Sequence, residues 1–281
     1  MKRASPLVST DWLAQHLDAP DVRIADASWY LPAAGRDAHA EYVSAHIPGA
    51  VFFDIEDLSD EASPLPHMLA PAPKFASRMR KLGLGDGNLI VVYDGAGIYS
   101  AARAWWMLRA MGHEDVVVLD GGLPKWRHEG HPVENMESFP YPRHFTPRPN
   151  NGLIRTRSHI EANLASRDEQ VVDARSAARF AGQEAEPRPG LRSGRIPGSR
   201  NVPYTELVLD DGTLRPPHEL TALFRARGID LTRPVTTTCG SGITAAIVLL
   251  ALSVSGAQDL ALYDGSWAEW GADTALPVET G

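Results

Sequence analysis

The sequence of 281 residues has a single cysteine, Cys239, so the chain cannot form an internal disulfide. Scarce cysteine is typical of proteins in a reducing compartment, and we expect a cytoplasmic location. Long hydrophobic runs are also lacking, because no stretch approaches the roughly 20 apolar residues of a membrane-spanning helix. We therefore expect a soluble protein without a membrane partner.

Positive charge is in deficit, with 27 Lys and Arg against 35 Asp and Glu and a net charge of −8. Without a basic run, this balance argues against nucleic acid or an anionic membrane surface as a partner. His128 and His131 lie three positions apart, but no third ligand accompanies them, so we expect no metal site. A hydrophobic content of 43% is ample for the core of one large or two ordinary domains.

Four short motifs occur twice in the same order, offset by 144 to 149 positions. The pairs are 24–27 with 171–174, 46–49 with 195–198, 91–95 with 236–240, and 120–126 with 264–270. An ordered repeat over the whole length predicts two copies of one domain.

Each half alternates short apolar runs with helical stretches. Runs 89–93 and 116–119 are typical of strands buried on both faces, and 101–111 between them is helical. The second half repeats this with 235–238, 245–253 and 260–263. We predict an α/β fold of two tandem domains, 1–135 and 153–281, each a mainly parallel sheet flanked by helices. The proline-rich segment 136–152 is predicted to be a linker.

Cys239 opens the heptapeptide Cys-Gly-Ser-Gly-Ile-Thr-Ala, between a β-prone run and an apolar helical run. A strand that turns sharply into a helix leaves backbone N–H groups unpaired at the helix start, which favours an anion such as a thiolate. Gly240 and Gly242 let the backbone curl around the sulfur without a Cβ penalty. Cys239 could instead be a small buried hydrophobic residue. The loop favours a nucleophile.

At the position of Cys239, the first half has Asp94. A carboxylate cannot serve as a sulfur nucleophile, so we expect the first domain to be catalytically silent. A single active site is then expected, in the second domain or between the domains.

The double domain, the two Ile-Pro-Gly turns and the cysteine loop together resemble the rhodanese superfamily, over about residues 9–270. The loop is similar to that of 3-mercaptopyruvate sulfurtransferases, whereas thiosulfate sulfurtransferases usually carry Arg-Lys where this chain has Gly240-Ser241. Two cations would attract the compact thiosulfate dianion, but a Gly-Ser pair suits one charge and a carbonyl. A carboxylate substrate also needs a planar, bidentate donor.

The resemblance implies a substrate and a covalent intermediate. Cys239 would take sulfur from 3-mercaptopyruvate as a persulfide, release pyruvate, and pass the sulfur to cyanide or to a thiol acceptor such as thioredoxin. No cofactor is implied beyond that persulfide. Arg179 and Arg188 match the family's substrate-binding pair, although arginines in a helix or loop are more often only solvated. The N–H groups of the loop would hold the persulfide; they belong to Gly240, Gly242, Ile243 and Thr244.

The resemblance also implies a proton relay, in which Ser241 works with a histidine and a carboxylate. The matching residues are His67 and Glu56, with Asp54 as a near alternative to Glu56. Glu56 is longer than the aspartate that other members can carry, so the hydrogen-bond reach of the relay differs here. For His67, a structural role is an equal alternative.

Three other functions are compatible with a cysteine loop on this fold. A thiosulfate:cyanide sulfurtransferase would use the same cysteine. A cysteine phosphatase would need an arginine six residues after the cysteine, where this chain has Ala245. A sulfur carrier without enzyme activity would keep the fold but would not need the cysteine loop and both arginines intact.

Overall fold

A computed structural model describes residues 5–281; residues 1–4, which the prediction placed in the first domain, lie outside the described part. The chain forms two compact units. The first unit runs up to residue 59 and includes 69–150 and 209–214; the second comprises 60–68, 151–208 and 215–281. Segment 60–68 thus belongs to the second unit and segment 209–214 to the first. The prediction instead divides the chain once, at the linker 136–152.

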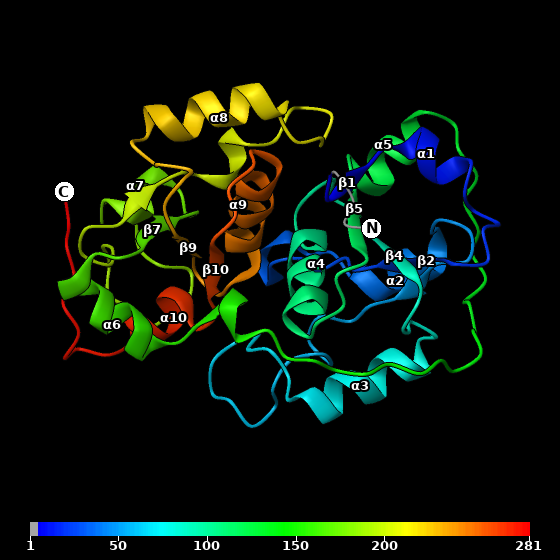
Figure 1. Cartoon of the computed structure of the whole chain (residues 1–281), viewed down its shortest axis with the longest axis horizontal. Helices are drawn as coiled ribbons and strands as arrows, with labels where there is room; N and C mark the ends of the chain where they lie inside the picture. Colours follow the sequence, from blue (N-terminus) through cyan, green and yellow to red (C-terminus); the bar gives the residue numbers. More distant parts are fainter. Residues whose placement is uncertain (1–4) are drawn as a thin grey trace. The chain divides into compact units, whose positions relative to one another are not determined.

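The first unit is built on a parallel sheet of five strands in the order β1-β5-β4-β2-β3 (Figure 1). The strands are β1 Leu7–Val8, β2 Val22–Asp26, β3 Val51–Phe52, β4 Leu89–Tyr93 and β5 Val116–Leu119. The helices are α1 Thr10–Ala14, α2 Ala38–Ser44, α3 Ala72–Lys81, α4 Ala101–Ala110 and α5 Gly122–His128, with a short 3-10 helix at Pro32–Ala34.

The second unit repeats this topology, with the strand order β6-β10-β9-β7-β8. The strands are β6 Ile154–Arg155, β7 Gln170–Asp173, β8 Arg200–Asn201, β9 Val235–Thr238 and β10 Leu260–Tyr263. The helices are α6 Arg157–Ser166, α7 Ala177–Phe180, α8 Pro217–Ala226, α9 Ile243–Val254 and α10 Ser266–Trp270, with 3-10 helices at Asn151–Leu153 and Tyr204–Glu206. The predicted fold class, two parallel α/β domains of one kind, is confirmed.

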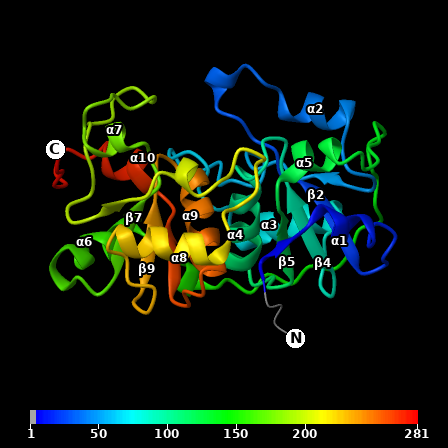
Figure 2. The ribbon, with the colours of Figure 1, turned by 90° about the horizontal axis from the view of Figure 1, so that it is seen from above.

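The central strands of the first unit have apolar side chains on both faces, because helices cover both faces of the sheet, whereas β9 of the second unit buries three threonines. In the first unit, Val91 and Tyr93 of β4 join a core cluster with Leu13 of α1 and Trp126 of α5. On the other face, α4 packs against β4 and β5, as α9 does against β9 and β10 in the second unit (Figure 2). This double cover explains the uninterrupted apolar runs of the sequence.

The predicted strands 89–93, 116–119, 235–238 and 260–263 have the bounds that the sequence indicated. Helix α9 begins at Ile243, two residues before the predicted start, because Gly242 takes a φ of 82° and lets the chain enter the helix directly. None of the helices within residues 5–281 combines the length and apolar character that a membrane crossing requires.

An aspartate ends the equivalent strands β2 and β7. Asp173 is paired with the buried guanidinium of Arg175, two residues further on. In the first unit Ser28 stands at that place, and its N–H and hydroxyl both donate to Asp26, at 2.9 and 2.5 Å. Burial raises the pKa of Asp26 from its usual 3.8 to about 6, although the Ser28 hydrogen bonds lower it.

We expect Asp26→Asn to stabilise the protein at neutral pH. Between about pH 4 and 6, the folded wild type holds a proton that the unfolded chain releases, so its stability falls as the pH rises and then levels off. Asparagine keeps an oxygen for Ser28 but carries no charge to bury. Its gain in unfolding free energy should grow from near zero at pH 4 to about 3 kcal/mol at pH 7. Calorimetry at several pH values measures it; a gain that does not change with pH would contradict the prediction.

Candidate active site

Cys239 lies between the end of β9 and the start of α9, and only 2% of its surface is exposed. The N–H of Gly242 donates to its Sγ atom at 3.2 Å. The first turn of α10 is hydrogen-bonded to the loop, since the N–H of Trp267 donates to the Cys239 carbonyl and the N–H of Ala268 to the Gly240 carbonyl, both at 2.9 Å. The Cys239 N–H in turn donates to Ser266 Oγ at 3.3 Å. The sulfur is thus fixed at a helix start.

The equivalent loop of the first unit contains its own anion. The Asp94 carboxylate accepts hydrogen bonds from the N–H groups of Ala96, Tyr99 and Ala101, each at 2.8 Å. A loop of this form between strand and helix therefore directs several backbone donors at one negative group. The equivalent positions in the second unit are 241, 244 and 246, and the N–H group that donates to Cys239 Sγ is that of Gly242.

Both predicted substrate-binding arginines lie over the cysteine loop. A Cβ atom on Gly240 would come within 3.1 Å of Nη2 of Arg179 and 3.9 Å of Nη1 of Arg188. Arg179 is at the end of α7, and Arg188 is in the segment that follows, which the first half lacks. Two guanidiniums beside the cysteine form a site for a carboxylate and a neighbouring oxygen.

A buried arginine near this site, Arg175, is not among the residues predicted from the sequence. The side chain of Arg175 is fully buried, donates to Asp173 at 2.7 Å and to Glu186 at 2.6 Å, and lies 4.3 Å over the ring of Trp267. Burial alone would lower the pKa of Arg175, but Asp173 and Glu186 outweigh it and raise that pKa. The signal in the sequence was the replacement of Ser28 by an arginine in the second copy, Asp-Ala-Ser becoming Asp-Ala-Arg.

Glu186 links that buried arginine to the site. Its Oε1 and Oε2 accept hydrogen bonds from Nε and Nη2 of Arg179, at 3.3 and 2.5 Å. The first unit has a comparable pair, in which Glu41 binds Arg36, and Arg36 donates to the carbonyl of Gly95. Each copy therefore places a carboxylate-bound guanidinium at the glycine that follows its cysteine or aspartate.

His67 and Ser241 are brought together within the second unit. Nδ1 of His67 lies 3.0 Å from Oγ of Ser241, although the two are 174 positions apart. His67 is buried and has a φ of 60°, a conformation that costs energy in a residue with a side chain and is often found at functional sites.

The predicted carboxylate of the relay, Glu56, belongs to the first unit. There it accepts a hydrogen bond from Nε1 of Trp29 at 2.7 Å. Asp54, the alternative, accepts from the N–H groups of Glu56 and Asp57 and so closes a turn. These contacts assign neither Glu56 nor Asp54 to the relay, so the carboxylate of the relay stays a prediction.

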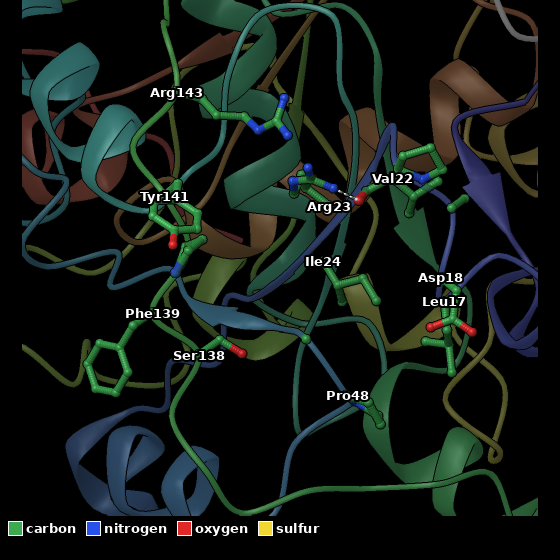
Figure 3. A pocket seen from close by; sticks show the side chains of 14 residues that line it. Leu17, Asp18, Val22, Arg23, Ile24, Pro48, Ser138, Phe139, Tyr141 and Arg143 are labelled. Carbon is green, nitrogen blue, oxygen red and sulfur yellow. Dashed lines mark hydrogen bonds between the residues drawn. The ribbon is translucent and has the colours of Figure 1, made fainter.

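A cavity of about 500 Å³ lies elsewhere, on the first unit (Figure 3). Residues 17–24 form one wall and 138–143 the other, and Nη1 of Arg23 donates to the Val22 carbonyl at 2.6 Å. Burial and the charge of Arg143 lower the pKa of Arg23. This cavity adjoins the beginning of β2, whereas the Asp94 loop follows the carboxyl end of β4 and the Cys239 loop follows that of β9. It is not part of the candidate active site. Within residues 5–281, no cluster of His, Cys, Asp or Glu side chains is arranged to hold a metal ion.

Comparison with known proteins places these features in a family. The model of the rhodanese-like domain matches twice, at residues 9–129 and 156–273. A 3-mercaptopyruvate sulfurtransferase of Escherichia coli is 46% identical over 97% of both chains. A thiosulfate sulfurtransferase of Bos taurus is 44% identical over 94% of this chain and 91% of its own length.

A solved structure agrees with the fold. The crystal structure of a 3-mercaptopyruvate sulfotransferase from Escherichia coli aligns with a TM-score of 0.87 and 43% identity, over 94% of this chain and 99% of that chain. With two family matches, high identity over nearly the full length and the same fold, the chain belongs to the rhodanese-like family of two-domain proteins that includes the 3-mercaptopyruvate sulfurtransferases.

Proposed function

We propose that this protein is a 3-mercaptopyruvate sulfurtransferase that carries sulfur as a persulfide on Cys239. The observation that carries the proposal is the convergence of Arg179 and Arg188 on Gly240, directly beside the cysteine. Two guanidinium groups next to a nucleophilic sulfur fit a substrate in which two carbon atoms separate the thiol from the carboxylate. The similar proteins from Escherichia coli, named as enzymes of 3-mercaptopyruvate, support the same substrate.

In the first half-reaction, Arg179 and Arg188 bind the carboxylate and carbonyl oxygens of mercaptopyruvate. The Cys239 thiolate attacks the substrate sulfur, forming an S–S bond while the C–S bond breaks. The electron pair of that bond leaves with the three-carbon fragment as the enolate of pyruvate. The outer sulfur stays on Cys239, within reach of loop N–H groups such as that of Gly242.

The enolate needs a proton before it leaves as pyruvate. Ser241 stands beside the cysteine and is hydrogen-bonded to His67, so its hydroxyl can give up a proton that His67 replaces. Glu56 remains our proposal for the carboxylate that completes the relay.

In the second half-reaction, an acceptor thiolate attacks the outer sulfur and restores the Cys239 thiolate. Reduced thioredoxin, a small thiol or, in vitro, cyanide has the required nucleophile. The first domain takes no covalent part, because Asp94 occupies the nucleophile position and its carboxylate already takes the loop's donors.

The nearest alternative is thiosulfate:cyanide sulfurtransferase, which the bovine relative favours. Thiosulfate would place two negative charges on a loop that offers Gly240 and Ser241 in place of two cations. The alternative of a sulfur carrier without catalysis is favoured by no specific contact.

Donor preference tests the proposal. We expect kcat/KM for mercaptopyruvate to exceed that for thiosulfate by about 100-fold, because Gly240 and Ser241 supply no cation for the second negative charge of thiosulfate. Pyruvate release and thiocyanate formation report the two reactions, with cyanide as the common acceptor. A preference for thiosulfate would establish the rival. Stable persulfide loading from another protein without pyruvate release would establish the carrier.

A further inference from the structure

We propose that Glu186, anchored by Arg175, is a positioning residue that sets the direction of the Arg179 guanidinium toward the substrate. The inference rests on the proposed function only in taking Arg179 as the donor to the substrate carboxylate. Glu186 itself contacts neither Cys239 nor the loop in the hydrogen bonds of the described residues, so it acts through the arginine.

The geometry divides the Arg179 guanidinium into two edges. Glu186 binds the side edge, formed by Nε and Nη2. The end edge, formed by Nη1 and the second hydrogen of Nη2, has no hydrogen-bond partner among residues 5–281, so it can bind another carboxylate. Nη2 is the Arg179 atom that lies nearest to Gly240. A fork held on one edge presents the other edge in a fixed plane, which bidentate recognition requires.

Glu186 can hold this plane because it is itself fixed to the sheet. Its side chain is 1% exposed and also binds Arg175, which is bonded to Asp173 at the end of β7. Strand β7 is hydrogen-bonded to β9, and β9 leads directly into Cys239. The Cys239 nucleophile and the Arg179 guanidinium are therefore both held in place by strands β7 and β9.

Charge alternates along this chain of side chains, from Asp173 to Arg175, Glu186 and Arg179. Each buried charge has an opposite neighbour, so the group is neutral before substrate binds. An arginine without such a partner loses rotamer freedom when it binds a ligand. Holding Arg179 in advance removes much of that cost from the binding step.

Two possible roles of Glu186 predict opposite effects of Glu186→Gln on the rate of reaction with anions. If it only placed a negative charge near the site, Glu186→Gln would make the site more positive and speed reactions of anions. If it positions Arg179, the same change would slow them, because the fork is no longer held. We expect Glu186→Gln to lower kcat/KM for mercaptopyruvate about tenfold, mainly through KM, since small misplacements of a binding group are costly.

Alkylation of Cys239 gives a readout that needs no turnover. Iodoacetate carries a carboxylate and iodoacetamide does not, so the ratio of their rates reports on the arginines. We expect the ratio to fall in Glu186→Gln toward the value of Arg179→Ala, with the iodoacetamide rate unchanged. Glu186→Asp, which keeps the charge but shortens the reach, is expected to lower it too. A rise in the ratio in Glu186→Gln, or no change in both variants, would overturn the proposal.

A double-mutant cycle tests whether Glu186 acts through Arg179. In the Arg179→Ala background, Glu186→Gln is expected to have no further effect on the ratio; an undiminished effect would overturn the proposal. The matched control is Glu169→Gln, which alters a 2.7 Å pair with Arg155 at the other end of the sheet and should leave the ratio unchanged. If the wild type released no pyruvate, the proposed function would fail, while the alkylation ratio would still decide the role of Glu186.

Discussion

Replacing Cys239 by serine is expected to abolish pyruvate release from mercaptopyruvate, by at least about four orders of magnitude in kcat. The reaction needs a sulfur that is both nucleophile and sulfur carrier, and the chain contains no second cysteine. Serine fits the same loop, since the Gly242 N–H that now meets Sγ can meet a hydroxyl. Mass spectrometry after incubation with the donor should show about +32 Da on the wild type and no adduct on the variant.

Thermal unfolding provides the control for this experiment. Because Cys239 is buried and its replacement is nearly isosteric, the midpoint of unfolding should change by only a few degrees. Retained pyruvate release in a folded Cys239→Ser protein would overturn the assignment of the nucleophile.

Replacing Arg175 by methionine is expected to destabilise the protein by about 3–5 kcal/mol, a drop of about 10 °C in the unfolding midpoint. The change leaves Asp173 buried without its cation and takes one of the two arginines from Glu186. Removing one partner of a buried pair costs more than removing both, because the remaining charge is left uncompensated. Denaturant unfolding monitored by fluorescence measures the loss.

Two further variants separate the buried pair from ordinary surface charges. Adding Asp173→Asn to Arg175→Met should recover part of the lost stability, since the stranded charge is removed. Arg227→Met, which breaks a pair with Glu206 whose side chains are 39% and 37% exposed, should cost at most about 1 kcal/mol. Equal losses for Arg175→Met and Arg227→Met would contradict the role given to burial.

The predicted strands matched the structure because their signal is local. A parallel strand covered on both faces is usually a short apolar or β-branched run, as Val116–Leu119 is, and this pattern can be recognised without knowing the neighbouring strands. The repeat added the topology, since two copies of one pattern implied two sheets of one order. The apolar residues predict a start of α9 at residue 245, whereas the helix begins at Ile243, because the chain enters it directly after Gly242.

The candidate site was only partly predictable from the sequence. The Cys239 loop was legible because strand, glycines and helix start are contiguous. The roles of Arg179, Arg188 and His67 came from resemblance, and the structure places all three at that loop. Arg175 escaped notice, since an arginine two residues after a strand aspartate is unremarkable until its burial is known.

By itself, then, the sequence determined the duplicated α/β fold, and it predicts the nucleophile at Cys239 and the loss of chemistry at Asp94. All three depend on residue identity and short-range order. Only the tertiary structure decided how the arginines are held. The link from Arg175 through Glu186 to Arg179 joins residues from a strand end, an irregular segment and a short helix, and neither periodicity nor spacing records which buried charges meet. Burial makes that link strong, and burial is a property of the whole fold.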